Sequence, residues 1–149
     1  MSIETNKAII RRYKVDILNS RDLAALDAIV GEDYLDHAAF PGQSPGRAGL
    51  KQRVSYLFDA FNPQWTIHDI VAERDIVVVR WSHSAVHRGE FLGLQPTGRE
   101  FTMRGIDIYR VTAGKMSEHW NVVDMLGMYQ QLGLSRIKTG RRLMIELVR

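Results

Sequence analysis

Asp124 is the residue whose type and position point most directly to chemistry. Side chains two apart share a face of an extended strand, so the face that carries Asp124 would also carry Glu118 and Trp120. If that face lines a cavity, the desolvated carboxyl group is suited to general acid or base catalysis near neutral pH. Asp124 could instead cap a helix that begins there, because a carboxylate accepts hydrogen bonds from free backbone N–H groups. The spacing leaves both roles open.

The histidines are the next candidates, because an imidazole exchanges protons near neutral pH. His37 stands at the start of a loop rich in proline and glycine, where it could hydrogen-bond a ligand or only the backbone. His83 and His87 are four apart in a predicted strand, which separates their Cα atoms by roughly 13 Å. That distance does not suit a shared zinc ion, and the HExxH pattern is absent from the sequence, so we expect no bound metal.

Apolar and aromatic side chains provide the predicted walls of a ligand site. A mixed lining of aromatic, methionine and polar side chains suits an apolar ligand held by few polar anchors. A plain hydrophobic core would also use several of these residues, so the lining alone does not decide between the two. The predicted substrate-binding residues are Tyr13, Trp81, His87, Met103 and Trp120.

The elements that must position these residues change character along the chain. Apolar residues at helical spacing predict helices over about 5–19, 22–31 and 47–61. Arg11, Arg12 and Lys14 are predicted to lie on a solvated face of the first helix. After Pro63, runs of β-branched residues predict strands over about 65–73, 76–87, 99–111 and 116–123. Helices followed by antiparallel strands indicate an α+β fold, in which a curved sheet folded over helices leaves a pocket between the two layers.

Composition limits the remaining function classes. The 149 residues suit one domain, and the absence of cysteine excludes disulfides and thiol nucleophiles. No apolar run approaches the roughly 20 residues of a membrane helix, and no secretory signal is evident, so we expect a cytoplasmic protein without a membrane partner. The net charge is +3, but residues 136–149 hold five basic residues and one acidic residue. The rest of the chain therefore lacks the basic face that a nucleic-acid partner would need.

The two parts of the chain are accordingly predicted as a domain over residues 1–135 and a basic C-terminal extension over residues 136–149. Apolar residues within the extension could form a further helix or an edge strand, docked on this subunit or on a neighbour. These residues are Leu143, Met144, Ile145, Leu147 and Val148.

Several stretches, taken together and in order, resemble the SnoaL-like polyketide cyclase family of the nuclear transport factor 2-like superfamily. They are EDYLDH at 32–37, IVVVRW at 76–81, HRGEFLGLQPTGR at 87–99, GKMSEHWNVVD at 114–124 and QQLG at 130–133. The resemblance implies a cone-shaped barrel, in which a strongly curved antiparallel sheet packs on N-terminal helices and encloses an apolar cavity. It also implies chemistry without a cofactor, in which an Asp is the general acid or base of an intramolecular aldol closure. By the Trp-x-x-x-Asp spacing that role falls on Asp124, and the early histidine of the family pattern matches His37.

We therefore predict a small enzyme that acts on an apolar, cyclic or polyketide-like carbonyl compound, as a lyase or isomerase. Asp124 would remove a proton next to the carbonyl group, and His37 or Tyr13 would stabilise the oxyanion. An epoxide hydrolase or dehydratase could use the same cavity. The third hypothesis is a non-catalytic protein that binds a small molecule or serves for dimerisation, and an exposed Asp124 would favour it. The superfamily also implies a homodimer formed through the open face of the sheet.

Overall fold

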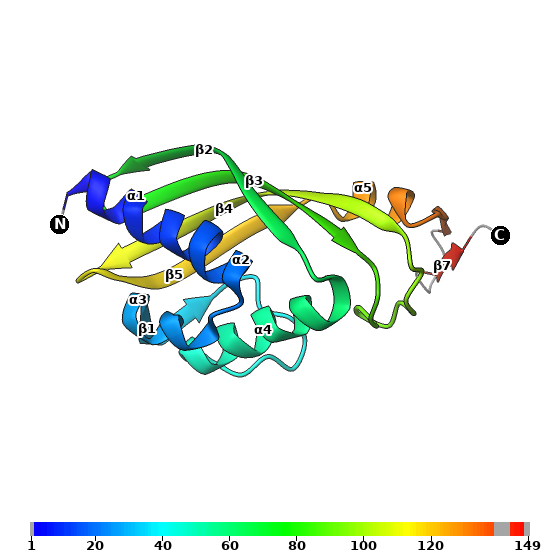
Figure 1. Ribbon diagram of the computed structural model, residues 1–149, viewed down its shortest axis with the longest axis horizontal. Helices are drawn as coiled ribbons and strands as arrows, with labels where there is room; N and C mark the ends of the chain where they lie inside the picture. The colour runs from blue at the N-terminus through cyan, green and yellow to red at the C-terminus, as the bar shows by residue number, and fades with distance from the viewer. Residues whose placement is uncertain (1, 139–143, 148–149) are drawn as a thin grey trace.

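The N-terminal helical segment is long and changes its winding halfway. The computed structural model describes residues 2–138 and 144–147 (Figure 1). Ser2 caps the first helix, since its hydroxyl accepts a hydrogen bond from the Thr5 N–H at 3.1 Å, so the helix begins earlier than predicted. Its middle is a π-helix, in which the Leu18 N–H donates to the Tyr13 carbonyl five residues earlier. The three parts are α1 Ile3–Arg11, η1 Arg12–Ile17 and α2 Leu18–Ser20.

Three further helical elements follow and form the rest of the helical layer, and the first two of them are continuous with each other. Asp22 caps the next segment, because its carboxylate accepts from the Ala25 N–H at 3.2 Å. The long helix α4 ends where Asn62 takes a left-handed conformation with φ +49 in front of Pro63. The bounds are η2 Leu23–Ala25, α3 Leu26–Ile29 and α4 Gly46–Phe61.

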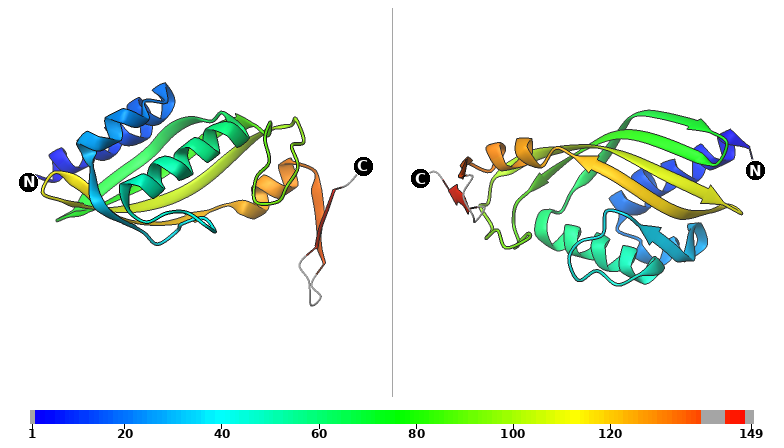
Figure 2. Two further views of the ribbon diagram at one scale, coloured as in Figure 1. Left: turned by 90° about the horizontal axis from the view of Figure 1, so that it is seen from below. Right: turned by 180° about the vertical axis from the view of Figure 1, so that it is seen from behind.

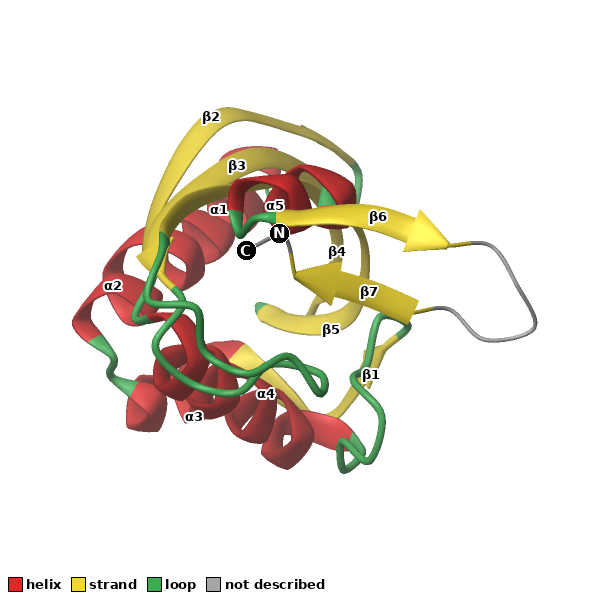
Figure 3. Ribbon diagram, turned by 90° about the vertical axis from the view of Figure 1, so that its right-hand side faces the viewer, coloured by secondary structure: helices red, strands yellow, loops and turns green. Residues whose placement is uncertain are grey.

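Five strands form one curved sheet in the order β1-β5-β4-β3-β2. Their bounds are β1 Val30–Asp36, β2 Gln64–Glu73, β3 Ile76–Val86, β4 Glu100–Thr112 and β5 Lys115–Val123. Neighbouring strands are antiparallel except β1 and β5, which are parallel. The sheet does not close into a barrel, since β1 and β2 form its two edges. It nevertheless curls strongly around the helices (Figures 2 and 3).

The helices cover the concave face of this sheet, and the hydrophobic core lies between the two layers (Figure 3). Burial alternates along β3 and β4, where the buried side chains are at odd-numbered positions. The predicted α+β fold is therefore confirmed. None of the helices in the described part of the chain is long and apolar enough to cross a membrane.

The end of the chain adds a helix and a hairpin beyond the sheet. The short helix α5 Met125–Gln131 follows β5, and strands β6 Leu134–Lys138 and β7 Met144–Leu147 pair with each other in an antiparallel two-stranded sheet. In Figure 2 this hairpin extends away from the main sheet. Met144, Ile145 and Leu147 thus belong to a strand that pairs within the chain, whereas Leu143 and Val148 lie outside the described residues.

Candidate active site

A cavity of about 80 Å³ lies between the helices and the concave face of the sheet. Its walls come from the first helical segment, from α4 and from the inner faces of β3, β4 and β5. Most of the lining is aliphatic or aromatic. Charged side chains from four different elements also reach it, and they are connected to one another.

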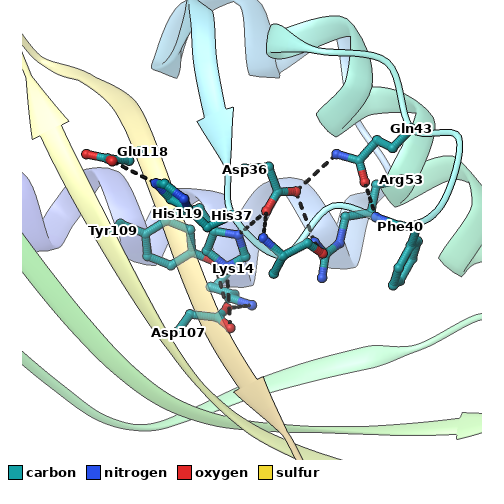
Figure 4. Close-up of polar contacts among 11 residues, drawn as sticks. Lys14, Asp36, His37, Phe40, Gln43, Arg53, Asp107, Tyr109, Glu118 and His119 are labelled. Carbon is teal, nitrogen blue, oxygen red and sulfur yellow. Dashed lines mark hydrogen bonds and ion pairs between the residues drawn. The ribbon is translucent and has the colours of Figure 1, made fainter.

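These charged side chains and Asp36 of β1, which does not itself line the cavity, form what we call the inner charge network, drawn in Figure 4: Lys14, Asp36, Arg53, Asp107 and His119. The Asp36 carboxylate accepts hydrogen bonds from His119 Nδ1 at 2.9 Å, from Arg53 Nη1 at 3.0 Å and from Gln43 Nε2 at 3.0 Å. Burial alone would raise the pKa of Asp36, but the His119 hydrogen bond and the Arg53 charge outweigh it and hold this pKa well below its usual range. Asp36 is therefore a fixed anion at neutral pH.

Asp107 is the second carboxylate of the network, and it forms a buried ion pair with Lys14. The Tyr109 hydroxyl donates to it at 2.7 Å. Burial acts to raise the pKa of Asp107, but the nearby Lys14 charge outweighs that effect and holds this pKa well below its ordinary value. Burial lowers the pKa of Lys14, and the charge of Asp107 opposes that effect. The Lys14 ammonium also lies 4.5 Å from the centroid of the Trp81 ring, in a cation–π contact.

His119 connects the two carboxylates. An ionised carboxylate can only accept, so Nδ1 must carry the proton donated to Asp36. When the ring holds this one proton, the lone pair of Nε2 is free to accept another. No described residue hydrogen-bonds to Nε2, and it lies 3.6 Å from Asp107 Oδ1, which also lacks a hydrogen-bond partner there. The ring stacks on Tyr109 with centroids 4.8 Å apart. This arrangement can take a proton at Nε2 and stabilise the resulting imidazolium through Asp36.

Strand register brings these residues together. The parallel pairing of β1 with β5 sets Asp36 beside His119, although they are 83 residues apart in the sequence. On β4, Asp107 points inward with Tyr109 because they are two apart. On the first helical segment, Lys14 follows Ile10 by four residues and therefore shares its buried face.

The predicted position of Asp124 in the cavity is wrong. Asp124 is exposed and caps α5, where its Oδ1 accepts from the Gly127 N–H at 2.8 Å. The cause is a bulge between β4 and β5: Val111 pairs with Met116, but Arg110 pairs with Glu118. The extra residue reverses the alternation after the buried Met116. The inner face of β5 therefore carries His119, Asn121 and Val123 instead of Glu118, Trp120 and Val122.

His37 and Trp120 also lie outside the cavity, on the outer face of the sheet, so their predicted placement in the pocket is wrong. Their rings stack with centroids 4.8 Å apart and planes 7° apart. His37 Nε2 donates to Glu118 at 2.8 Å, and the His37 side chain is 40% exposed. Arg110 contacts both Glu118 and Asp75 at 2.8 Å. We call this set the outer charge network: His37, Asp75, Arg110 and Glu118.

The other predicted binding residues divide into two groups. Tyr13, Trp81 and Met103 line the cavity, as their positions in the sequence predicted. His87 is fully buried but does not line the cavity. Its Nδ1 accepts from the Thr97 N–H at 3.2 Å, and this hydrogen bond holds the loop over residues 87–99. Within the described residues, no group of three histidine or acidic side chains could hold a metal ion.

The inner charge network itself was missed by the sequence analysis. Its signals were weak but present: Lys14 recurs at helical spacing with Ile10 and Ile17, and Asp107 stands in a strand beside apolar residues on the same face. A charged residue at an apolar position is informative, because charged side chains are rarely buried without a partner. No sequence signal paired Asp36 with His119, since that contact depends on the register of the sheet.

The fold and the site together define a small α+β protein whose cavity holds a histidine–carboxylate acid/base arrangement. The SnoaL-like polyketide cyclase family matches residues 8–132, and the chain belongs to this family.

Among curated relatives, aklanonic acid methyl ester cyclase DnrD of Streptomyces peucetius is 33% identical over 135 residues, which cover 88% of this chain and 92% of the relative. The nogalonic acid methyl ester cyclase of Streptomyces nogalater is 25% identical over 126 residues, or 80% and 91% of the two chains.

Solved structures agree with this assignment. TsrD from Streptomyces laurentii has a TM-score of 0.81 and 25% identity, and the match covers 89% of this chain and 98% of that one. Wild-type IdmH from Streptomyces antibioticus has a TM-score of 0.75 and 30% identity, covering 86% and 98%. The predicted family is therefore confirmed.

Proposed function

We propose that the protein catalyses an aldol-type ring closure of a polyketide-like carbonyl compound, with His119 as the general base. One observation carries the assignment of the base: His119 lines the cavity, its Nε2 has no hydrogen-bond partner in the described structure, and its Nδ1 is held by the buried Asp36. The relatives named above as methyl ester cyclases support ring closure as the reaction.

The proposed reaction needs only proton transfers and one new carbon–carbon bond. His119 Nε2 takes a proton from the carbon next to a carbonyl group, which leaves an enolate and an imidazolium. The enolate carbon attacks a second carbonyl carbon of the same molecule, and the resulting alkoxide takes the proton back from Nε2. Asp36 stabilises the imidazolium throughout, and Arg53 holds Asp36 in position.

Other cavity side chains can stabilise the enolate oxygen. The Lys14 ammonium supplies positive charge, and Asn121 lines the same wall two residues after His119. Burial raises the pKa of Tyr13 far above its ordinary value, so this phenol stays protonated and can donate a hydrogen bond. Tyr13 thus keeps the oxyanion role predicted from the sequence.

Substrate binding requires the walls to move, because about 80 Å³ is much less than the roughly 300–1,000 Å³ of typical small-molecule sites. Phe40 and Arg53 separate the cavity from a second hollow of about 320 Å³ at the surface. The Arg53 guanidinium stacks over the Phe40 ring at 4.5 Å. Rotation of Phe40 away from Arg53 would join the two hollows.

A hydration reaction, such as epoxide opening or dehydration, is the second candidate. The 3.6 Å separation of His119 Nε2 and Asp107 Oδ1 favours it, because both atoms could orient one small hydroxylic molecule. Product analysis separates the two reactions, since ring closure keeps the mass of the substrate and hydration or dehydration changes it by one water.

We also propose a homodimer through the outer face of the sheet. Ile106 and Val122 are cross-strand partners on this face and are 47% and 77% exposed. Sedimentation equilibrium tests the proposal, and a monomer at all concentrations would refute it.

The decisive experiment measures turnover of aklanonic acid methyl ester by wild-type protein and by His119→Gln. General base catalysis contributes about 10²–10⁴-fold, so we expect a loss of that size with the fold retained by circular dichroism. His68→Gln, on the exposed edge of the sheet, is the matched control and should retain turnover. Asp124→Asn tests the alternative base, because its exposed position as a helix cap predicts no loss.

Two outcomes would refute the proposal. One is turnover by His119→Gln above about a tenth of the wild-type rate. The other is failure of the wild-type protein to cyclise either aklanonic or nogalonic acid methyl ester.

A further inference from the structure

A second pair of polar groups lies in the cavity wall, on β3. Trp81 and His83 are two apart on β3, both line the cavity, and they are 5% and 3% exposed. Neither Trp81 Nε1 nor His83 Nδ1 has a hydrogen-bond partner among the residues that the structure describes. Buried polar atoms are nearly always hydrogen-bonded, because an unpaired one loses its hydration without compensation. Two such atoms on one wall of a cavity indicate a place where a ligand supplies the partner.

The two rings are held in position by their surroundings. Their centroids are 5.7 Å apart and their planes differ by 14°, so they stack. Trp65 packs edge-on against His83 at 5.1 Å. Opposite Trp81 in the sheet is Gly105, where a Cβ atom would lie 2.5 Å from the indole Cζ2. The absence of a side chain at Gly105 therefore leaves space for the Trp81 indole. Trp81 Nε1 and His83 Nδ1 thus belong to rings whose positions are set by close packing.

The His83 end of this pair lies away from the two carboxylates, whereas the Trp81 ring contacts the Lys14 ammonium at 4.5 Å. His83 is opposite Met103 on β4, and Asp107 is four residues further along that strand, which is roughly 13 Å. Burial lowers the pKa of His83 to about 3, so the imidazole is uncharged at neutral pH. An uncharged imidazole beside an indole N–H suits a neutral hydroxyl group that both accepts and donates.

We infer that Trp81 and His83 form a second polar subsite, which binds a phenolic hydroxyl group on the aromatic part of the substrate. The Trp81 Nε1–H donates to the phenol oxygen, and the phenol O–H donates to His83 Nδ1. The surrounding aromatic rings pack on the ring that carries the hydroxyl. This inference rests on the proposed function in one respect only, namely that the cavity is where substrate binds.

Phenol and toluene are a matched pair of probes, because they differ by a hydroxyl group in place of a methyl group of similar size. An apolar cavity prefers toluene, since burying an unpaired hydroxyl group is costly. We expect wild-type protein to bind phenol at least as tightly as toluene in calorimetric titrations. His83→Phe keeps a planar ring and removes the polar atom, so toluene should bind about tenfold tighter than phenol. His83→Gln restores a side chain that can hydrogen-bond and should recover phenol binding.

His68→Phe is the control, because it makes the same substitution on the exposed edge of the sheet and should keep the wild-type ratio. In wild-type protein labelled with ¹⁵N-histidine, phenol should shift the His83 Nδ1 resonance and toluene should not, which tests the contact without a variant. A wild-type preference for toluene, an unchanged ratio in His83→Phe, or no binding of either probe would overturn the inference. None of these measurements requires ring closure, so they stand apart from the turnover of His119→Gln.

Discussion

The two charge networks lie on opposite faces of the same strands and show what burial does to similar chemistry. Both connect a histidine to a carboxylate, and both extend through further charged residues. The His119 and Asp36 side chains are 6% and 5% exposed, whereas those of His37 and Glu118 are 40% and 22% exposed. Water screens the outer network, so its members interact weakly. In the inner charge network, each buried charge is stabilised by the charged groups that contact it, and these contacts fix the orientation of the His119 ring.

The largest difference should come from removing one carboxylate from each network. Asp107→Asn leaves the Lys14 ammonium buried without a counter-charge, and we expect it to lower the free energy of unfolding by about 3–5 kcal/mol. Asp75→Asn makes the same substitution in the outer charge network and should lower the free energy of unfolding far less. Urea denaturation measures both.

Adding Lys14→Met to Asp107→Asn should recover at least half of the loss, because no unpaired charge then remains. Equal losses for Asp107→Asn and Asp75→Asn would mean that burial does not distinguish the two networks.

The second largest difference between the two networks should be in how the stability of the protein depends on pH. The pKa values of Asp36 and Asp107 in the folded protein lie below the unfolded value of about 3.9. Their contribution to stability is therefore complete above about pH 5 and is lost as the pH falls through the unfolded value toward the folded ones. Below pH 4, Asp36→Asn should lose stability less steeply than wild type, by about 1 kcal/mol per pH unit.

Urea denaturation at a series of pH values between 3 and 7 checks this slope. Asp75→Asn is the matched variant from the outer network and should follow the wild-type curve. Parallel curves for wild type and Asp36→Asn would show that Asp36 does not contribute in this way.

The smallest effect should be that of His37, the histidine of the outer network. His37→Gln removes its interaction with Glu118 and its stacking on Trp120, both on the side of the sheet away from the cavity. We expect turnover to change by less than about twofold, as for an exposed position remote from the site. A loss comparable to that of His119→Gln would assign His37 a role in catalysis and undo the distinction between the two faces.

The sequence predicted the main helices and the four antiparallel strands, and it placed Tyr13, Trp81 and Met103 on the inner side, because helical and strand spacings are local properties. It did not predict β1, whose parallel pairing with β5 is a long-range contact. It failed at β5, where one bulged residue reverses the alternation and moves Asp124 and Trp120 to the outside. A bulge depends on the pairing with β4, which local spacing does not contain.

The inner charge network was unpredictable for a related reason. Asp36 meets His119 only through the parallel register of β1 and β5. Lys14 could have been placed inside by its spacing from Ile10, but its charge favoured solvent. The Asp107 carboxylate that compensates the burial of the Lys14 ammonium comes from β4, so only the tertiary structure shows the pair.

The bulge in β5 also bears on how the chain avoids misfolded pairings. Without it, the register from Val111 and Met116 would pair Glu118 with Tyr109 on the inner face, and His119 would lie on the outer face. Such a mispaired sheet would bury the Glu118 carboxylate without the partners His37 and Arg110 that it has on the outer face, which is unfavourable. The positions of the charged residues on β5 therefore favour the register that contains the bulge.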